Sequence, residues 1–167
     1  MTDKERRLVM AMATQGLPPS EFLKQFRSST DGKLLCGELL SEAVNSRVAE
    51  DVEWSLIVGY TFGFTERHME ALLQLSKEPW HFKHEDVVTA LGRLKTPKAV
   101  DALLAATKWV PDYLGFDESR ALAVKAIWAL GGIEGSEADA ALNAVVSDPD
   151  PVLVAAAVEQ LKRRKAA

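Results

Sequence analysis

The fold is decided by ALGRLKTPKAV, residues 90–100, because much of this segment recurs 39 residues further along the chain. The second copy reads ALGGI at 129–133 and SEA at 136–138, and a truncated third copy, VEQL, occupies 158–161. Repeats of this length each contribute one helix pair that cannot bury its apolar face alone. We therefore expect helix pairs that stack side by side, share one core and leave an extended surface for a partner.

Helical spacing of apolar residues continues through the rest of the chain, and the alternation typical of strands is nearly absent. Glycine, proline and capping residues predict about 9–10 helices. The expected helices cover 3–14, the segment after Ser20, 33–47, 50–60, the segment after Thr65, the segment up to Leu94, the segment opened by Pro97, 119–130, the segment capped by Ser136, and the segment after Pro151. We expect one all-α domain over 1–167, with an irregular helical part over 1–80 and regular repeats over 84–165.

The charge of the chain restricts the class of partner. The net charge of the 167 residues is −4 and the isoelectric point is about 5.4. Duplex nucleic acid favours basic proteins, so this charge argues against DNA or RNA as the main ligand. The same charge suits a basic protein partner.

A single cysteine, Cys36, rules out an internal disulfide, which is typical of a reducing compartment. Its apolar neighbours predict a small buried residue. A catalytic role is not expected, because no histidine lies nearby in sequence to activate the thiolate as a nucleophile. The apolar run from Leu8 to Ala13 is too short for a secretory signal, and no stretch has the length of a membrane span. We expect a cytoplasmic protein with no membrane partner.

The segment from His84 to Leu161 resembles the HEAT-like repeats of phycobilisome lyases. The resemblance lies in the two Ala-Leu-Gly triplets, in the helix starts PKAV (97–100) and SEA (136–138), and in the turn DPDP (148–151). It implies a right-handed α-solenoid of antiparallel helix pairs with a divergent N-terminal half. Such repeats commonly carry an arginine early in the first helix that ties neighbouring repeats together. Those positions hold His84, Ala123 and Val154 here, so we expect packing, rather than ion pairs, to join the repeats.

The most chemically suggestive segment is WHFKHED, residues 80–86. His81, His84 and Glu85 could supply metal ligands from one helical turn. The His-Glu pair also resembles the signature of deoxyhypusine hydroxylase, a HEAT-like enzyme whose di-iron centre uses four such pairs. This chain has one pair, and the next repeat has Ala-Val at 123–124. A di-iron centre needs several carboxylate and imidazole ligands together, so we expect no metal and no cofactor.

An insertion, WVPDYLGFD at 109–117, lengthens one repeat beyond what its core requires. Its aromatic side chains are typical anchors of protein interfaces, and its carboxylates add negative charge. The same aromatics could fold back as a lid over the repeat junction, and the sequence leaves both interpretations open. We expect the insertion and the 80–86 segment to line one protein-binding surface. The residues expected there are Trp80, His81, His84, Glu85, Trp109, Asp112, Tyr113, Phe116, Asp117 and Arg120.

Three further expectations concern single side chains and the basic tail. Trp54 and Trp128 lie inside apolar helices, which predicts that both are core residues. Arg120 is expected to pair with Asp117 or Glu118. The tail KRRK, residues 162–165, is expected to be a solvated last helical turn, where cations are favoured.

Sequence signatures of catalysis are missing: there is no phosphate-binding glycine loop, Cys-x-x-Cys, zinc-protease spacing or Gly-x-Ser-x-Gly. We therefore expect a non-catalytic protein-binding module and not an enzyme. The overall pattern resembles small bacterial immunity proteins, which implies that the chain binds and neutralises a bacterial toxin. The partner would be another protein, a basic toxin domain, and the assembly a monomer or a weak dimer.

Three alternatives stay open at this point. The chain could be a generic bacterial adaptor or scaffold. It could be a metal-dependent, oxygenase-like HEAT-repeat enzyme that uses His81, His84 and Glu85. It could also process nucleic acid, as helical-repeat glycosylases do, although the acidic charge disfavours this function.

Overall fold

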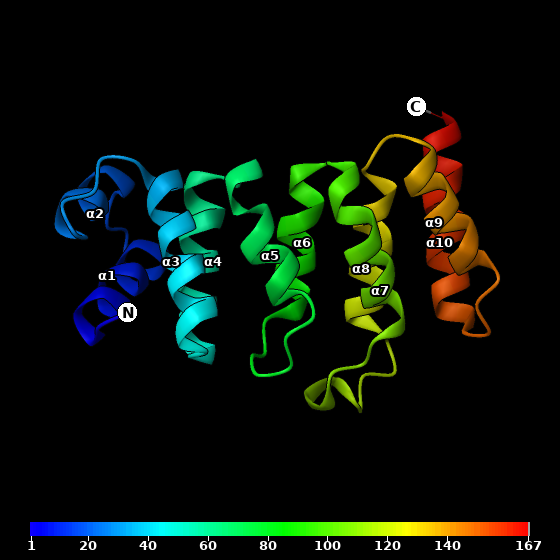
Figure 1. Ribbon diagram of the computed structural model, residues 1–167, viewed down its shortest axis with the longest axis horizontal. Helices are drawn as coiled ribbons and strands as arrows, with labels where there is room; N and C mark the ends of the chain where they lie inside the picture. Colours follow the sequence, from blue (N-terminus) through cyan, green and yellow to red (C-terminus); the bar gives the residue numbers. More distant parts are fainter. Residues whose placement is uncertain (167) are drawn as a thin grey trace. The chain divides into compact units, whose positions relative to one another are not determined.

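Ten α-helices and three short 3-10 helices lie within residues 1–166, the part that the computed structural model describes (Figure 1). In chain order they are α1 (Asp3–Thr14), α2 (Pro19–Gln25), α3 (Gly32–Ser46), α4 (Ala49–Phe62), η1 (Glu66–His68), α5 (Met69–Leu75), α6 (His84–Leu94), η2 (Pro97–Ala99), α7 (Val100–Lys108), η3 (Asp112–Leu114), α8 (Ala121–Gly131), α9 (Ser136–Val146) and α10 (Pro151–Ala166). No strand occurs among these residues. The all-α class and the number of helices expected from the sequence are confirmed.

The chain divides into two compact units, Met1–Gln74 and Leu75–Ala167. Unit 1 holds α1 to α4, η1 and nearly all of α5, and unit 2 holds α6 to α10 with η2 and η3. The boundary lies close to residue 80, where the sequence changes from irregular helices to repeats. The expectations of a single domain over 1–167 and of a right-handed solenoid stay predictions.

Unit 1 is organised around α3 and α4, which are joined by only two residues and pack against each other. Asp31 caps the start of α3, where its carboxylate accepts hydrogen bonds from the backbone N–H groups of Lys33 (2.8 Å) and Leu34 (3.1 Å). Cys36 lies inside this pair and is fully buried. The expectation of a small buried residue is confirmed, and burial raises the pKa of its thiol to about 12.

In unit 2, α8 is the central helix, since it packs against α6, α7, α9 and α10. Its buried stripe follows helical spacing: Leu122, Ala126 and Leu130 are almost fully inaccessible to solvent, as are Ala123 and Ile127. The first helices of successive repeats, α6, α8 and α10, therefore stack side by side, and α7 and α9 cover them. The stacked helix pairs expected from the repeat are present in this unit.

The Ala-Leu-Gly triplets recur because the glycines permit close approach between successive first helices. A Cβ atom added at Gly92 in α6 would lie 2.7 Å from the Cβ of Ala129 in α8. A Cβ atom added at Gly131 in α8 would overlap the side chain of Gln160 in α10. The repeated glycine therefore has a packing role that recurs from one repeat to the next.

Ion pairs also join the helices of unit 2, so the expectation that packing alone joins the repeats is wrong. Lys125 of α8 pairs with Glu85 of α6 at 2.8 Å, and Arg164 of α10 pairs with Asp139 of α9 at 2.8 Å. The cations come from positions that the family pattern does not mark, and this is why the pattern did not reveal them.

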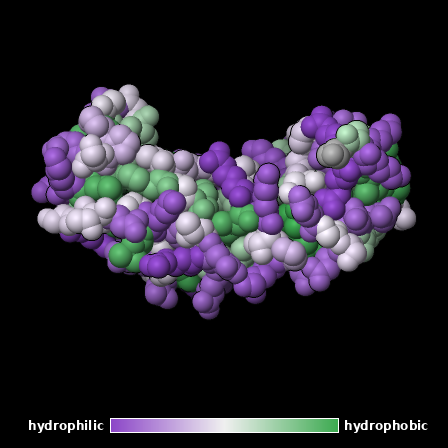
Figure 2. Space-filling model, turned by 90° about the horizontal axis from the view of Figure 1, so that it is seen from above, coloured by the Kyte–Doolittle hydropathy of each residue, from purple (hydrophilic) through white to green (hydrophobic). Residues whose placement is uncertain are grey.

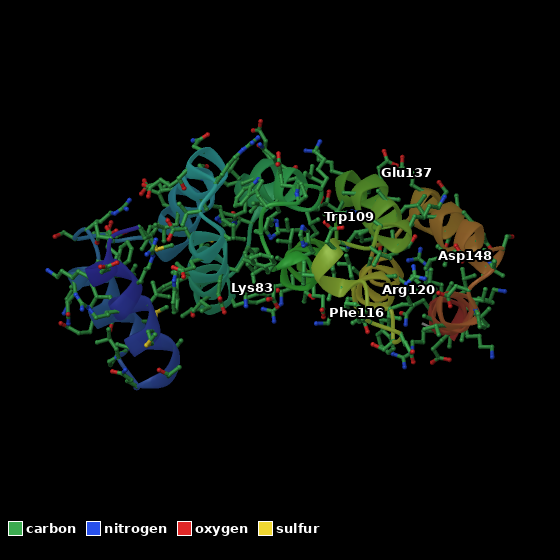
Figure 3. All side chains as sticks on the ribbon, turned by 90° about the horizontal axis from the view of Figure 1, so that it is seen from below. Lys83, Trp109, Phe116, Arg120, Glu137 and Asp148 are labelled. Atoms are coloured by element: carbon green, nitrogen blue, oxygen red, sulfur yellow. The ribbon has the colours of Figure 1, made fainter. Side chains whose placement is uncertain are left out.

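Arg120 binds Asp150 at 2.6 Å, and not Asp117 or Glu118 as expected. Asp117 is occupied by the start of α8, where its carboxylate accepts hydrogen bonds from the N–H groups of Ser119 (3.1 Å) and Ala121 (2.6 Å). Arg120 therefore ties the start of α8 to the turn before α10. Figure 3 labels Arg120, and also Asp148, which lies in the turn before α10.

Trp128 is not a core residue, because 45% of its surface is exposed. It lies three residues after Lys125, on the outward side of α8, and the guanidinium of Arg163 stands 4.3 Å from its ring centroid. Trp54 is half-buried rather than fully buried. Both tryptophans belong to helices so rich in apolar residues that composition alone does not show which face is buried.

The basic tail is not uniformly solvated. Hydrophilic residues gather at the end of α10, as Figure 2 shows from that side of the molecule. Arg164 is half-buried, however, and its guanidinium donates hydrogen bonds to the carbonyl groups of Gly131 and Ile133. It therefore caps the C-terminal end of α8, where carbonyl groups lack partners within the helix.

Candidate functional site

Two buried histidines form the centre of the site expected from the sequence. His81 lies in the loop before α6 and His84 is the first residue of α6. Their rings stack with centroids 4.0 Å apart and planes tilted by 19°, and neither residue is exposed to solvent. Their burial differs from the expectation that they line the protein-binding surface. They lie beneath that surface instead.

Hydrogen bonds define the protonation of both rings. The Nδ1 atom of His81 accepts a hydrogen bond from the backbone N–H of Lys83 (3.1 Å), so Nε2 carries the proton and donates it to the carbonyl of Leu75 (2.8 Å). His84 donates from Nε2 to the carbonyl of Glu78 (2.8 Å), and its Nδ1 accepts from the hydroxyl of Tyr113 (3.0 Å). The His81 ring is therefore neutral, and a neutral His84 ring accepts the hydroxyl proton of Tyr113 at Nδ1.

Burial also keeps both histidines neutral, because it disfavours the charged imidazolium. Desolvation, with a smaller contribution from the neighbouring His84, lowers the pKa of His81 to about 4 against the opposing effect of the Leu75 carbonyl. Desolvation likewise lowers the pKa of His84. The two groups thus behave as polar core residues at neutral pH.

This geometry does not suit a metal site. All four ring nitrogens of the two histidines bind protein groups, so no lone pair is left for a metal ion. The carboxylate of Glu85 points elsewhere, to the ammonium of Lys125. Within residues 1–166 there is no group of three or more His, Cys, Asp or Glu side chains that could hold a metal.

The insertion folds back over His84, and two of its aromatic residues contact that ring. The ring of Trp109 meets His84 edge-on, with centroids 4.6 Å apart, and the ring of Tyr113 stacks on His84 at 5.6 Å. For these two residues the lid interpretation is therefore correct. The lid is fastened by the hydrogen bond between the Tyr113 hydroxyl and His84.

Three aromatic side chains of the same region are exposed to solvent. Phe116 is 100% exposed and Phe82 is 62% exposed, and Tyr113 is 37% exposed despite its contact with His84. The rings of Phe82 and Tyr113 meet edge-on at 5.4 Å. We call Phe82, Tyr113 and Phe116 the aromatic surface. Figure 3 labels two residues of the insertion, Trp109 and Phe116. The 80–86 segment and the insertion do lie together, as expected from the sequence.

Negative charge lies close to the aromatic surface. Glu85 and Asp86, in the first turn of α6, add to the desolvation that raises the pKa of Tyr113. Asp112 is exposed next to Tyr113, whereas the carboxylate of Asp117 is hydrogen-bonded to the first residue of α8.

Trp80 is held in place locally, because its Nε1–H donates to the carboxylate of Glu78 at 2.9 Å.

Residues 85–108 match the family model of the PBS lyase HEAT-like repeat. The matched range covers α6, η2 and α7, which together form the first helix pair of unit 2. The chain contains a HEAT-like helical repeat. Searches of curated proteins and of solved structures found no match. The comparison therefore identifies the architecture of the repeat, and the site has to be judged by its geometry.

The HEAT-like repeat carries the candidate site at one of its ends. Glu85 and Asp86 belong to the first turn of its first helix, and the insertion follows directly after its second helix. His84 stands just before the matched range, in a place where the following repeat has the buried Ala123. The histidine therefore replaces a small core residue, and the ring of Tyr113 covers it.

Sequence reasoning missed Phe82 as a member of the surface, although it lies within the segment 80–86. The sequence did contain a sign of this exposure, since Phe82 stands between two polar residues in a loop before a helix, where an aromatic side chain has no core to enter.

None of the helices within residues 1–166 has both the length and the apolar character needed to cross a bilayer.

Proposed function

We propose that this protein is a non-catalytic module that binds another protein through the aromatic surface. HEAT-like repeats often mediate protein interactions, and this supports the general class. The observation that carries the proposal is the edge-on contact between the exposed rings of Phe82 and Tyr113, 5.4 Å apart, with the fully exposed Phe116 three residues further along the same insertion. Aromatic rings clustered on a surface are typical anchors of protein interfaces.

The proposed partner is a basic protein. Asp112 and Asp86 lie beside the aromatic surface, and the chain as a whole carries a net charge of −4. Complementary charge accelerates association and favours partners of opposite sign. A basic toxin domain fits this chemistry. We therefore propose an immunity-type protein of the bacterial cytoplasm that neutralises a toxin by covering its surface.

The non-catalytic character of the proposal is supported by the condition of the reactive groups. The thiol of Cys36 is buried, with its pKa raised to about 12, and so it is a poor nucleophile. His81 and His84 are buried and have all their ring nitrogens engaged, so neither is placed to exchange protons with a bound substrate.

Phe116→Ala is expected to weaken partner binding by about tenfold or more, because truncation of an aromatic anchor commonly costs about 2 kcal/mol. The protein encoded by the neighbouring reading frame of the genome is the partner to test. Isothermal titration calorimetry of the purified pair measures the change in Kd. Stability should not change, since the exposed Phe116 side chain makes no core contact.

Val152→Ala is the matched control, because Val152 is an exposed apolar residue of the same unit at the start of α10. This variant should bind with the affinity of the unmodified protein. Equal affinity of the Phe116→Ala variant would place the interface elsewhere. Failure of the two proteins to associate would contradict the toxin-neutralising role.

A further inference from the structure

A pocket of about 950 Å³ lies between α8, α9 and α10 of unit 2, on helices that pack against one another. Its volume is typical of sites that hold ligands. Gln160 of α10 lines it, and so do Asn143 of α9 and the apolar side chains of Trp128 and Leu161. We call it the Gln160 pocket. The three residues of the aromatic surface are not among those that line it.

Gln160 is a buried polar side chain without a partner. Only 5% of the residue is exposed, and no group within residues 1–166 accepts a hydrogen bond from its buried Nε2 atom. Buried polar groups are almost always hydrogen-bonded, because an unsatisfied donor has lost its bonds to water and gained nothing in return. The terminal torsion of a glutamine is broad, so the amide can turn toward the pocket within its rotamer. An acceptor supplied by a bound molecule would then remove the cost of burial.

Helix packing does not require an amide at this position. Gln160 lies against Gly131 of α8, where an added Cβ atom would overlap the amide. In the corresponding contact of the preceding repeat, Gly92 of α6 faces Ala129 of α8. An alanine is therefore enough to pack against such a glycine. The larger side chain of Gln160 adds a hydrogen-bonding group that the core does not use.

The charged groups of the Gln160 pocket are already balanced. Arg164 pairs with Asp139 at 2.8 Å, and Arg163 pairs with Glu159 at 2.8 Å. The other lining charges are one carboxylate and one ammonium, which are opposite in sign. The pocket therefore offers no surplus charge to an ionic ligand. Its unsatisfied group is a neutral amide, and this group sets the chemistry of the ligand.

We infer that the Gln160 pocket binds the backbone of an uncharged, extended peptide segment of another protein. A carboxamide both donates and accepts, so that of Gln160 would form a pair of hydrogen bonds with one peptide amide group. Asn143 supplies a second site, because its Nδ2 donates to the Asp139 carbonyl (2.8 Å) and leaves its Oδ1 as an acceptor. An apolar side chain of the peptide would lie against Leu161. The inference does not depend on the proposed function, because it uses neither the aromatic surface nor a basic partner.

Two amide side chains on different helices favour a peptide over a nucleobase. Amide groups recur about every 3.5 Å along an extended chain, so one peptide can bond to Gln160 of α10 and Asn143 of α9 together. A single base has one short hydrogen-bonding edge and no backbone that reaches the second side chain. Main-chain hydrogen bonds combined with a pocket for a side chain are also a recurrent basis of peptide recognition.

The first test needs no ligand, because it asks whether the Gln160 amide is satisfied in the free protein. Gln160→Met keeps the length of the side chain and removes its hydrogen-bonding groups. Thermal unfolding followed by circular dichroism should show a Tm that is unchanged or raised by up to about 4 °C. Gln74→Met, at an exposed glutamine of α5, is the matched control and should leave Tm within about 1 °C. A Tm that Gln160→Met lowers by more than about 2 °C would show that the amide is already bonded, which overturns the inference.

The second test follows peptide binding by heteronuclear NMR spectra of the isotopically labelled full chain. The probe is acetyl-Ala-Leu-Ala methylamide, and the control peptide carries methyl groups on the same backbone nitrogens, so that it cannot donate. The probe should shift the signals of the Gln160 Nε2 hydrogens with a Kd on the order of a millimolar. The methylated peptide should bind at least about tenfold more weakly. Added salt should have little effect, because the contacts are between neutral groups.

The same two variants connect binding to the side chain. Gln160→Met should weaken binding of the probe at least about tenfold, as measured on backbone signals of α10, because both hydrogen bonds of the amide are lost. Gln74→Met should leave Kd within about twofold, since Gln74 lies in unit 1 and outside the pocket.

Three results of the NMR experiment would overturn the inference. The probe could leave the Gln160 signals unshifted at about 10 mM. Uridine, which has a similar hydrogen-bonding edge but no extended chain, could bind as tightly as the probe, and the ligand would then be a base. The affinity for the probe could also fall steeply with salt, which is the behaviour of a charged ligand. None of these results bears on the Phe116 interface, so the two proposals succeed or fail separately.

Discussion

Gly92→Ala is expected to destabilise unit 2 by about 1–3 kcal/mol, a cost typical of overpacking between helices. In an open helical position the same change would stabilise the chain, because alanine is the better helix former by about 1 kcal/mol. At Gly92 the new Cβ would lie 2.7 Å from the Cβ and 3.1 Å from the Cα of Ala129. The second of these atoms is backbone, so α6 and α8 would have to move apart.

Two further variants make the experiment decisive. Gly132→Ala is the matched control, because the nearest atom to its added Cβ would be the carbonyl oxygen of Ala129 at 3.5 Å, an ordinary contact. It should change stability by less than about 0.5 kcal/mol. Ala129→Gly in the Gly92→Ala background should recover part of the loss, which a double-mutant cycle measures as coupling. Urea unfolding followed by tryptophan fluorescence gives the free energies. Gly92→Ala that is as stable as the unmodified chain would contradict the close-approach account.

The architecture of unit 2 could be predicted from the sequence because the residues that allow close helix packing occur more than once, at the same positions of successive repeats. The recurrence of glycine at 92 and 131 marks the close approach of successive first helices, and the structure places both glycines there. Gly131 ends α8 as expected, while Gly135 rather than Ser136 precedes α9. Capping residues are interchangeable over a position or two, so such boundaries are the least predictable feature.

The helix faces of unit 2 were harder to predict, as Trp128 shows. The helix α8 has a single charged residue, Lys125, so almost every position looked suitable for burial. Burial follows Leu122, Ala126 and Leu130, which leaves Trp128 on the side of Lys125. Lys125, three residues earlier, was the one residue of α8 that marked the exposed face. The large apolar ring of Trp128 favoured burial more strongly in the sequence-based prediction.

The segments that form the candidate site could be predicted from the sequence, but not which of their side chains would be buried and which exposed. The sequence identified both the 80–86 segment and the insertion, and the structure brings them together. It could not show that His84 would be covered by Tyr113, because this contact joins residues 29 positions apart. His84 is a core residue because the insertion supplies the Tyr113 hydroxyl to its Nδ1 and the rings of Trp109 and Tyr113 against its imidazole, and His81 stacks on His84 in turn.

Lowering the pH from about 7 to about 5 is expected to destabilise unit 2 by about 2 kcal/mol through His81 alone. Its folded-state pKa is about 4, whereas the ordinary value is 6.5. As the pH falls below about 6.5, the unfolded chain binds a proton that the folded chain resists, so stability declines until about pH 4. At about 1.4 kcal/mol for each unit of pKa, the loss by pH 5 approaches 2 kcal/mol. His84, whose pKa burial also lowers, adds to the loss.

The charged neighbours do not reverse this direction. The Glu78 carboxylate favours the protonated form of His81, but desolvation and the adjoining His84 have the larger combined effect. Carboxylates such as Glu5, whose pKa is lowered to about 2 by its hydrogen bond with Arg27, protonate in the unfolded chain only near the ordinary value of 4.5. The range between about pH 6.5 and about pH 5 therefore isolates the histidines.

Urea unfolding at about pH 7 and about pH 5 measures the difference, and His81→Gln identifies its source. Glutamine offers both a donor for the Leu75 carbonyl and an acceptor for the Lys83 N–H, and it does not titrate. The variant should therefore lose less stability than the unmodified chain over the same range, and the remaining loss should come largely from His84. If the two proteins lose stability equally, the burial of a neutral His81 does not contribute to the pH dependence. In that case the His81 imidazole takes up its proton in the folded state as readily as in the unfolded chain.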